Sequence, residues 1–147
     1  MIKKKMIIPF FIVAIISSGL AQDGTSRLQT HLKKYFNTTV EKVKMAESPD
    51  QQRQILNDSM HKLVMVLNTI QNRSDIPAQD LPAVNKLKKQ FQQKIDELNG
   101  RNGFNRVTDG NLVDFATYVQ QDMEQADRYV TLSLTTVLLI IIILLLI

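Results

Sequence analysis

"SPDQQRQILNDSMHKLVMVLNTIQ", residues 48–71, is the stretch that decides the fold. Ser48 is a good helix cap, Pro49 fits a first helical turn, and Asp50 suits the positive end of a helix dipole. Gln51 completes a capping box with Ser48. The apolar residues that follow lie on one face of a 3.6-residue helix: Ile55, Leu56, Met60, Leu63, Val64, Leu67 and Ile70. This spacing predicts an amphipathic helix with one buried face.

The same apolar spacing occurs in three further segments, residues 28–43, 84–98 and 112–130. Thr25 or Ser26 is the expected cap of the first, and the third is expected to begin near Thr108 or Asp109. No alternating run suggests a strand. The sequence therefore predicts an all-α fold, a small antiparallel bundle of about four helices.

The loops between these segments carry ordinary helix-boundary signals. Residues 72–82 contain two prolines, with Asp75 and Asp80 as possible caps for the helix that follows. Asn99-Gly100 is a typical helix end. We therefore expect short connections between antiparallel neighbours.

The C-terminal tail, residues 130–147, contains no charged residue. Its last eleven residues are all aliphatic: Val137, Leu138, Leu139, Ile140, Ile141, Ile142, Ile143, Leu144, Leu145, Leu146 and Ile147. Eighteen helical residues measure about 27 Å, close to a hydrocarbon core of about 30 Å. No break separates the tail from the fourth helix, so we expect the last helix to continue into a C-terminal transmembrane segment. The alternative is a tail that is buried inside the bundle or an oligomer.

The N-terminus has the three parts of a secretory signal. Lys3, Lys4 and Lys5 precede an apolar run of 11 residues and a small-residue segment that ends at Ala21. Cleavage is expected between Ala21 and Gln22, and an uncleaved N-terminal anchor is the alternative. The predicted organisation is a signal peptide (1–21), an extracytoplasmic bundle (22–129) and a membrane anchor (130–147). The protein is expected in the cytoplasmic membrane as a single-pass protein, with the bundle on the periplasmic or cell-surface side and no cytoplasmic domain.

Charge and composition exclude several functional classes. The chain has 18 basic and 14 acidic residues, and removal of the three signal lysines leaves 15 against 14, so we expect no nucleic-acid partner. The absence of cysteine excludes disulfides, thiol catalysis and a cysteine-bound zinc. His31 and His61 lack the Glu-x-x-His context of bundle metal enzymes. The sequence predicts no catalysis, no cofactor, no metal and no small-molecule substrate.

A polar surface beside the tail is the candidate for protein contacts. It consists of Gln120, Gln121, Glu124, Asp127 and Arg128, on the side away from the apolar stripe of the fourth helix. A protein partner, a second copy of the chain or plain solvation would each suit such a face.

These features support a leading hypothesis and two alternatives. The first is a membrane-tethered, extracytoplasmic helical module that acts as a scaffold or adaptor, with the lipid bilayer as one partner. The second is a membrane-active protein, of the pore-forming or lysis type, whose C-terminal helix inserts into a target bilayer. The third is a surface protein on a glycolipid anchor, with the tail removed. Three glycosylation triplets begin at Asn37, Asn57 and Asn72, but the possible attachment sites are poorly spaced from the tail.

Overall fold

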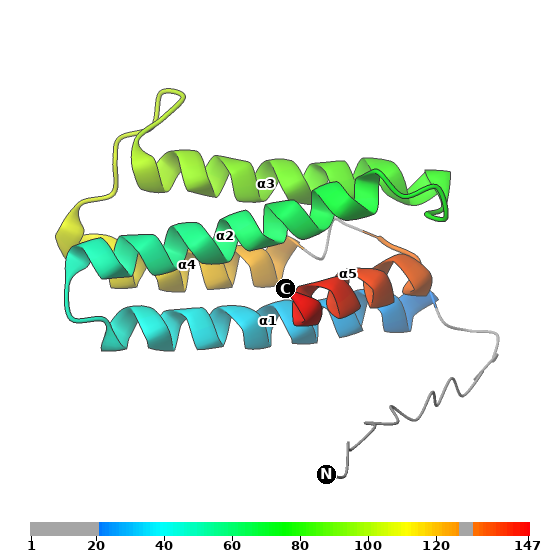
Figure 1. Ribbon diagram of the computed structural model, residues 1–147, viewed down its shortest axis with the longest axis horizontal. Coiled ribbons are helices and arrows are strands. Elements are labelled where there is room, and N and C mark those ends of the chain that lie inside the picture. Colours follow the sequence, from blue (N-terminus) through cyan, green and yellow to red (C-terminus); the bar gives the residue numbers. More distant parts are fainter. Residues whose placement is uncertain (1–20, 127–130) are drawn as a thin grey trace, which may run out of the picture.

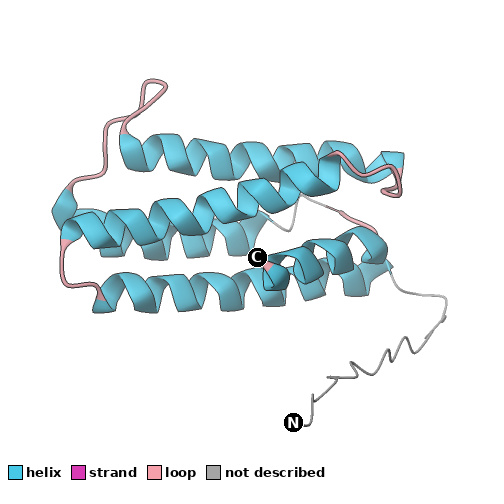
Figure 2. Cartoon of the chain, in the orientation of Figure 1, coloured by secondary structure: helices cyan, strands magenta, loops and turns pink. Residues whose placement is uncertain are grey.

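The computed structural model describes residues 21–126 and 131–147, and all regular structure in these ranges is helical (Figures 1 and 2). The α-helices are α1 (Ala21–Met45), α2 (Pro49–Gln71), α3 (Leu81–Asn99), α4 (Leu112–Ala126) and α5 (Leu134–Leu146), with 3₁₀ turns η1 (Ala78–Asp80) and η2 (Asp109–Asn111). The expected all-α helical bundle is confirmed. The signal prediction falls on residues 1–20, outside the described ranges, and on Ala21 and Gln22 at the start of α1.

The bundle core lies between two helix pairs, because α2 packs chiefly on α3 and α1 packs chiefly on α4. The apolar faces that the sequence predicts are buried in it, including Val43, Met60, Leu98 and others. Phe36 of α1 stacks on Phe91 of α3, with ring centroids 5.9 Å apart. An offset aromatic pair of this kind adds to the area that the two rings bury.

The start of α2 and the end of α3 follow the expected local signals. Ser48 Oγ accepts a hydrogen bond from the Gln51 amide at 3.3 Å, and Gln51 Oε1 accepts one from the Glu47 amide at 3.0 Å. The return bond of the capping box thus goes to Glu47, one residue before the cap. Gly100 ends α3 in the left-handed conformation, with φ 67°.

The expected continuous helix from the bundle into the tail is wrong. α4 ends at Ala126, residues 131–133 are not helical, and α5 begins as a separate helix at Leu134. Ser133 supplies the physical reason: its backbone is extended, and its Oγ accepts from the Thr136 amide at 3.5 Å, so it starts a new helix. Helix α5 lies back against α1 and α2 (Figure 1). Within the described ranges, no helix has both the length and the apolar content that spanning a membrane requires.

Candidate functional site at the docked C-terminal helix

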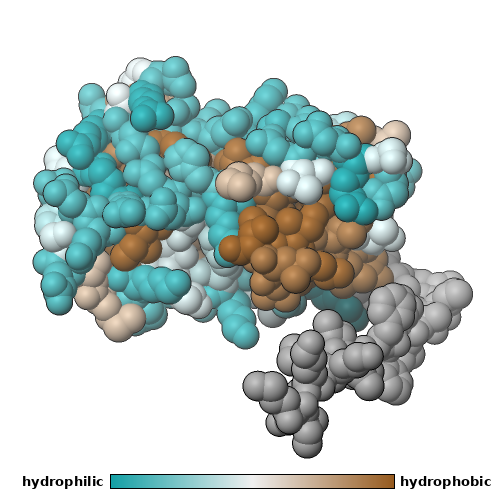
Figure 3. Space-filling model, in the orientation of Figure 1, coloured by the Kyte–Doolittle hydropathy of each residue, from teal (hydrophilic) through white to brown (hydrophobic). Residues whose placement is uncertain are grey.

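Helix α5 buries one face on the bundle and leaves the other face apolar and exposed. Toward α1 and α2 it buries Thr136, Val137, Ile140, Ile141 and Leu144. The outer face carries large exposed aliphatic side chains: Leu138, Ile142, Leu145, Leu146 and, at the helix end, Ile147. Figure 3 shows the result as the largest continuous hydrophobic patch on the face in view. Patches of this kind commonly mark contact sites for membranes, partners or ligands.

A buried carboxylate holds the start of α5. Asp80 is 4% exposed, and its oxygens accept from the Ser133 amide at 3.2 and 3.3 Å and from Thr136 Oγ1 at 2.6 Å. Ser133 Oγ also donates to Asp80 Oδ2. We call these three residues the Asp80 cluster. Its negative charge lies at the positive end of the α5 dipole, which adds to the four hydrogen bonds.

The Asp80 cluster changes the role expected for Asp80. Asp80 does occupy the cap position of α3, but its side chain makes no cap hydrogen bond there. The carboxylate instead reaches residues more than 50 positions away in the chain. No local pattern indicates such a contact, although the Ser133-x-x-Thr136 spacing is a helix-start signal that the sequence does contain.

A buried guanidinium joins α2 to the α3–α4 connection. Arg53 is 8% exposed and donates to the carbonyls of Leu98 and Val107, each at 2.6 Å. It also pairs with Asp109 at 3.0 Å, and that carboxylate is largely exposed. Planar guanidinium groups suit several oxygen acceptors at once, so Arg53 fixes the loop that precedes α4.

Lys94 of the basic α3 contacts the acidic α4. Its ammonium lies 3.1 Å from Asp122 and 3.4 Å from Glu97, lies 3.9 Å from the ring centroid of Tyr118, and donates to Tyr118 Oη. Burial by itself lowers the pKa of Lys94, but the bonds to Tyr118 and Asp122 and the two nearby carboxylates outweigh it. The pKa therefore lies above 10.5.

The structure places three of the five residues of the expected partner surface. Gln121 is exposed, Gln120 donates to Asn37 of α1, and Glu124 pairs with Lys33 of α1 at 3.5 Å. Two of the three thus contribute to the α1–α4 contact. Asp127 and Arg128 lie outside the described residues, and a partner on this face stays a prediction.

Neither histidine belongs to a metal-binding group among the described residues. In the part of the chain that the structure describes, no group of three or more His, Cys, Asp and Glu side chains is placed to hold a metal. His61 Nδ1 lies 2.8 Å from the Asn57 carbonyl, within its own helix. His31 lines a pocket beside α5, together with lysines from α1 and α2. The sequence contains no recognised motif for that pocket.

The docked helix, the Asp80 cluster and the adjoining pocket together form the candidate site. Its chemistry is that of binding: an aliphatic surface, a carboxylate that holds a helix start, and a basic rim. No family model, curated protein or solved structure matches the chain. The function is therefore inferred from these residues alone.

Proposed function

We propose that the chain is an exported helical bundle whose α5 is a conditional membrane anchor, docked on the bundle in one state and inserted in a bilayer in another. This proposal develops the alternative of a membrane-active protein. The observation that carries it is the all-round apolar character of a helix of which only one face is covered. A helix that is permanently docked on a soluble bundle normally carries polar residues on its outer face.

The energetic cost of exposing α5 to water favours its release from the bundle only where a bilayer can take it up. Undocking α5 into water would expose Val137, Ile140, Ile141 and Leu144. At roughly 1.5–3 kcal/mol per side chain, this costs about 6–12 kcal/mol. Insertion into hydrocarbon restores that burial and also covers the outer face. The docked state is thus favoured in water, and the inserted state becomes competitive only where lipid is present.

Length adds one structural requirement. Helix α5 has 13 residues and measures about 20 Å, short of a hydrocarbon core of about 30 Å. Helical extension through residues 131–133 would bring it to about 24 Å. That extension requires Ser133 to leave its extended conformation and Asp80 to give up its bonds to α5. Insertion and opening of the Asp80 cluster are therefore coupled in this proposal.

Flotation with lipid vesicles tests the proposal. The chain contains no cysteine, so Thr38→Cys with Leu145→Cys introduces a unique pair on the α1 and α5 walls of one pocket. A short bismaleimide crosslinker then pins α5 to α1. We expect the unlinked double variant to float with vesicles and to resist carbonate extraction, and the crosslinked protein to stay soluble. Equal flotation of both forms would refute the conditional anchor.

A permanently inserted tail is the second candidate, and the uncharged composition of α5 favours it. Permanent tethering would raise the effective concentration of the bundle for partners on the same membrane, including a second copy. It predicts that cell fractionation finds the full-length protein only in the membrane, with no soluble pool. Mass spectrometry of the mature protein separates both candidates from a glycolipid anchor, because recovery of Ile147 excludes removal of the tail.

A further inference from the structure

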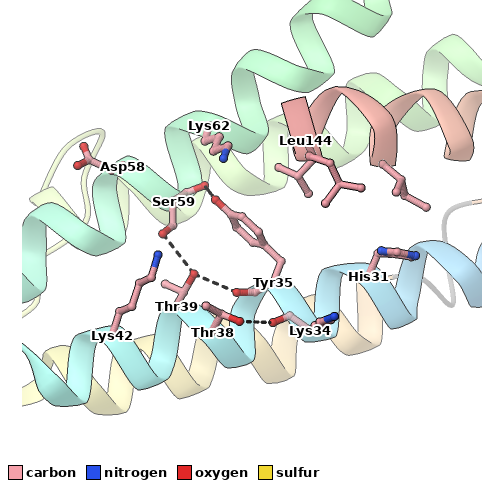
Figure 4. A pocket seen from close by; sticks show the side chains of 12 residues that line it. His31, Lys34, Tyr35, Thr38, Thr39, Lys42, Asp58, Ser59, Lys62 and Leu144 are labelled. Carbon is pink, nitrogen blue, oxygen red and sulfur yellow. Dashed lines mark hydrogen bonds between the residues drawn. The ribbon is translucent and has the colours of Figure 1, made fainter. Parts of the chain in front are cut away.

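A pocket of about 650 Å³ lies between α1, α2 and the C-terminal half of α5 (Figure 4). This volume falls within the range of sites that hold small organic molecules. The walls differ in chemistry: α1 and α2 contribute polar and basic side chains, and α5 contributes only Ile141, Leu144 and Leu145. A ligand that fills the pocket must therefore have one polar and one aliphatic part.

The basic wall carries unpaired positive charge. Lys34 and Lys42 of α1 and Lys62 of α2 line the pocket, and none of them has an ion pair with any described residue. Neighbouring lysines on α1 behave differently, because Lys33 pairs with Glu124 and Lys44 pairs with Glu41. In Figure 4, Lys42 and Lys62 point into the space between their helices.

Among the described residues, Asp58 is the one carboxylate on the pocket wall, against these three lysines. The excess of positive charge complements an anionic group.

The hydroxyl groups of the pocket are hydrogen-bonded within the protein. Tyr35 Oη donates to the Ser59 carbonyl at 2.9 Å, and Thr39 Oγ1 lies 3.2 Å from Ser59 Oγ. The pKa of Tyr35 is raised, chiefly by its burial, so the phenol stays neutral and its ring adds to the apolar surface. The lysine ammonium groups carry the positive charge that would meet an anionic ligand head, and the exposed His31 lies on the same pocket wall.

We propose that this pocket binds one single-chain anionic amphiphile, with a carboxylate or phosphate head between the lysines of α1 and α2. The alkyl chain lies along Ile141, Leu144 and Leu145 of α5. The site uses α5 in its docked position and does not depend on insertion of α5 into a bilayer. A ligand bound between α5 and the bundle stabilises the docked state by mass action.

Calorimetric titration of the full chain tests the proposal. The probe is sodium dodecanoate below its micelle concentration, with acetate as the head without a chain and dodecyltrimethylammonium as the chain with the opposite charge. We expect saturable binding of one dodecanoate that neither control reproduces. Lys42→Gln with Lys62→Gln should weaken this binding about tenfold. Lys44→Gln with Lys89→Gln removes the same charge from exposed positions outside the pocket and should leave the affinity unchanged.

The apolar wall is tested separately by Leu145→Asn. Leu145 is 76% exposed, so this variant should keep its thermal midpoint while losing dodecanoate affinity. The proposal is overturned if dodecyltrimethylammonium binds as well as dodecanoate, or if both lysine variants lose affinity equally. Binding that begins only with micelles or vesicles also overturns it, and points to a lipid surface instead. Dodecanoate binding and vesicle flotation are separate measurements, so failure of one proposal is distinguishable from failure of the other.

Discussion

Replacing Asp80 by alanine should release the start of α5 while leaving the rest of the bundle folded. The substitution removes the carboxylate oxygens that accept from the Ser133 amide and from the hydroxyls of Ser133 and Thr136. Thr136 is fully buried, so loss of the carboxylate removes the acceptor of a buried hydroxyl, at a cost of about 1–3 kcal/mol. Loss of negative charge and of an acceptor at the helix start adds about 1 kcal/mol.

The combined penalty of about 2–4 kcal/mol falls on the docking equilibrium of α5. A shift of this size raises the undocked fraction roughly 30- to 700-fold. Ile140→Cys supplies the probe, since this side chain is buried against the bundle and would be the only thiol in the chain. With opening faster than modification, the rate of thiol alkylation should rise by the same factor in the Asp80→Ala background.

Asp75→Ala is the matched control, because Asp75 lies in the same connection but is exposed and pairs only locally with Arg73. It should leave the alkylation rate unchanged. Hydrogen exchange gives the second readout: amides of α5 should lose protection, while those of α2 and α3 keep it. Equal loss of protection in all helices would refute the reasoning, because Asp80 would then stabilise the whole bundle through α3.

Three further perturbations concern the bundle itself. Arg53→Ala should lower the free energy of unfolding by about 2–4 kcal/mol, because it leaves the buried Leu98 carbonyl without its donor. Asp109→Ala removes only the exposed partner of Arg53 and should cost less than about 1 kcal/mol. Urea denaturation measures both, and equal losses would contradict the assignment. Because the pKa of Lys94 is raised in the folded state, its charged form stabilises the fold fully below pH 10.5. This stabilisation is lost as the pH rises through the folded-state pKa, so the thermal midpoint should fall at alkaline pH. Lys94→Met should flatten that fall, and an unchanged slope would contradict it. Gly100→Ala should destabilise more than Gly103→Ala, because both residues have positive φ but only at Gly100 would a Cβ lie 2.8 Å from Arg106. Denaturation midpoints in the opposite order would exclude that contact as the cause.

The sequence predicts the parts of the fold that depend on local chemistry. Ser48-Pro49 starts α2, Gly100 ends α3, and the apolar stripes become the core, because caps and helical periodicity act within a few residues. The break before α5 was missed for a specific reason. Neither glycine nor proline marks it, and a serine within an uncharged run is equally compatible with a continuous transmembrane helix, because its hydroxyl can bond to a helix carbonyl.

The candidate site depends on contacts between distant segments, which explains why so little of it could be predicted. Asp80 and Ser133 are 53 residues apart, and the pocket joins lysines of α1 and α2 to aliphatic residues of α5. From its local sequence alone, each residue is predicted to be a helix cap, a solvated cation or part of an apolar tail. Only the fold-back of α5 brings the carboxylate, the cations and the tail together.

The aliphatic composition of α5 favours an environment that buries more of its surface than the bundle does. Among the described residues, five of the nine exposed large hydrophobic residues lie in α5 or at Ile147, which follows it. The other four lie elsewhere in the chain: Met45, Met65, Phe104 and Tyr118. Packing on α1 and α2 accounts for Val137 and Ile140 but not for Leu138, Ile142 or Leu145. Those outer residues remain 38–76% exposed in the docked state, and any surface that covers the exposed area is favoured by up to roughly 1.5–3 kcal/mol per side chain. The few hydrogen bonds of the Asp80 cluster hold the start of α5 on the bundle. The aliphatic outer face of α5 favours transfer to lipid once those bonds open.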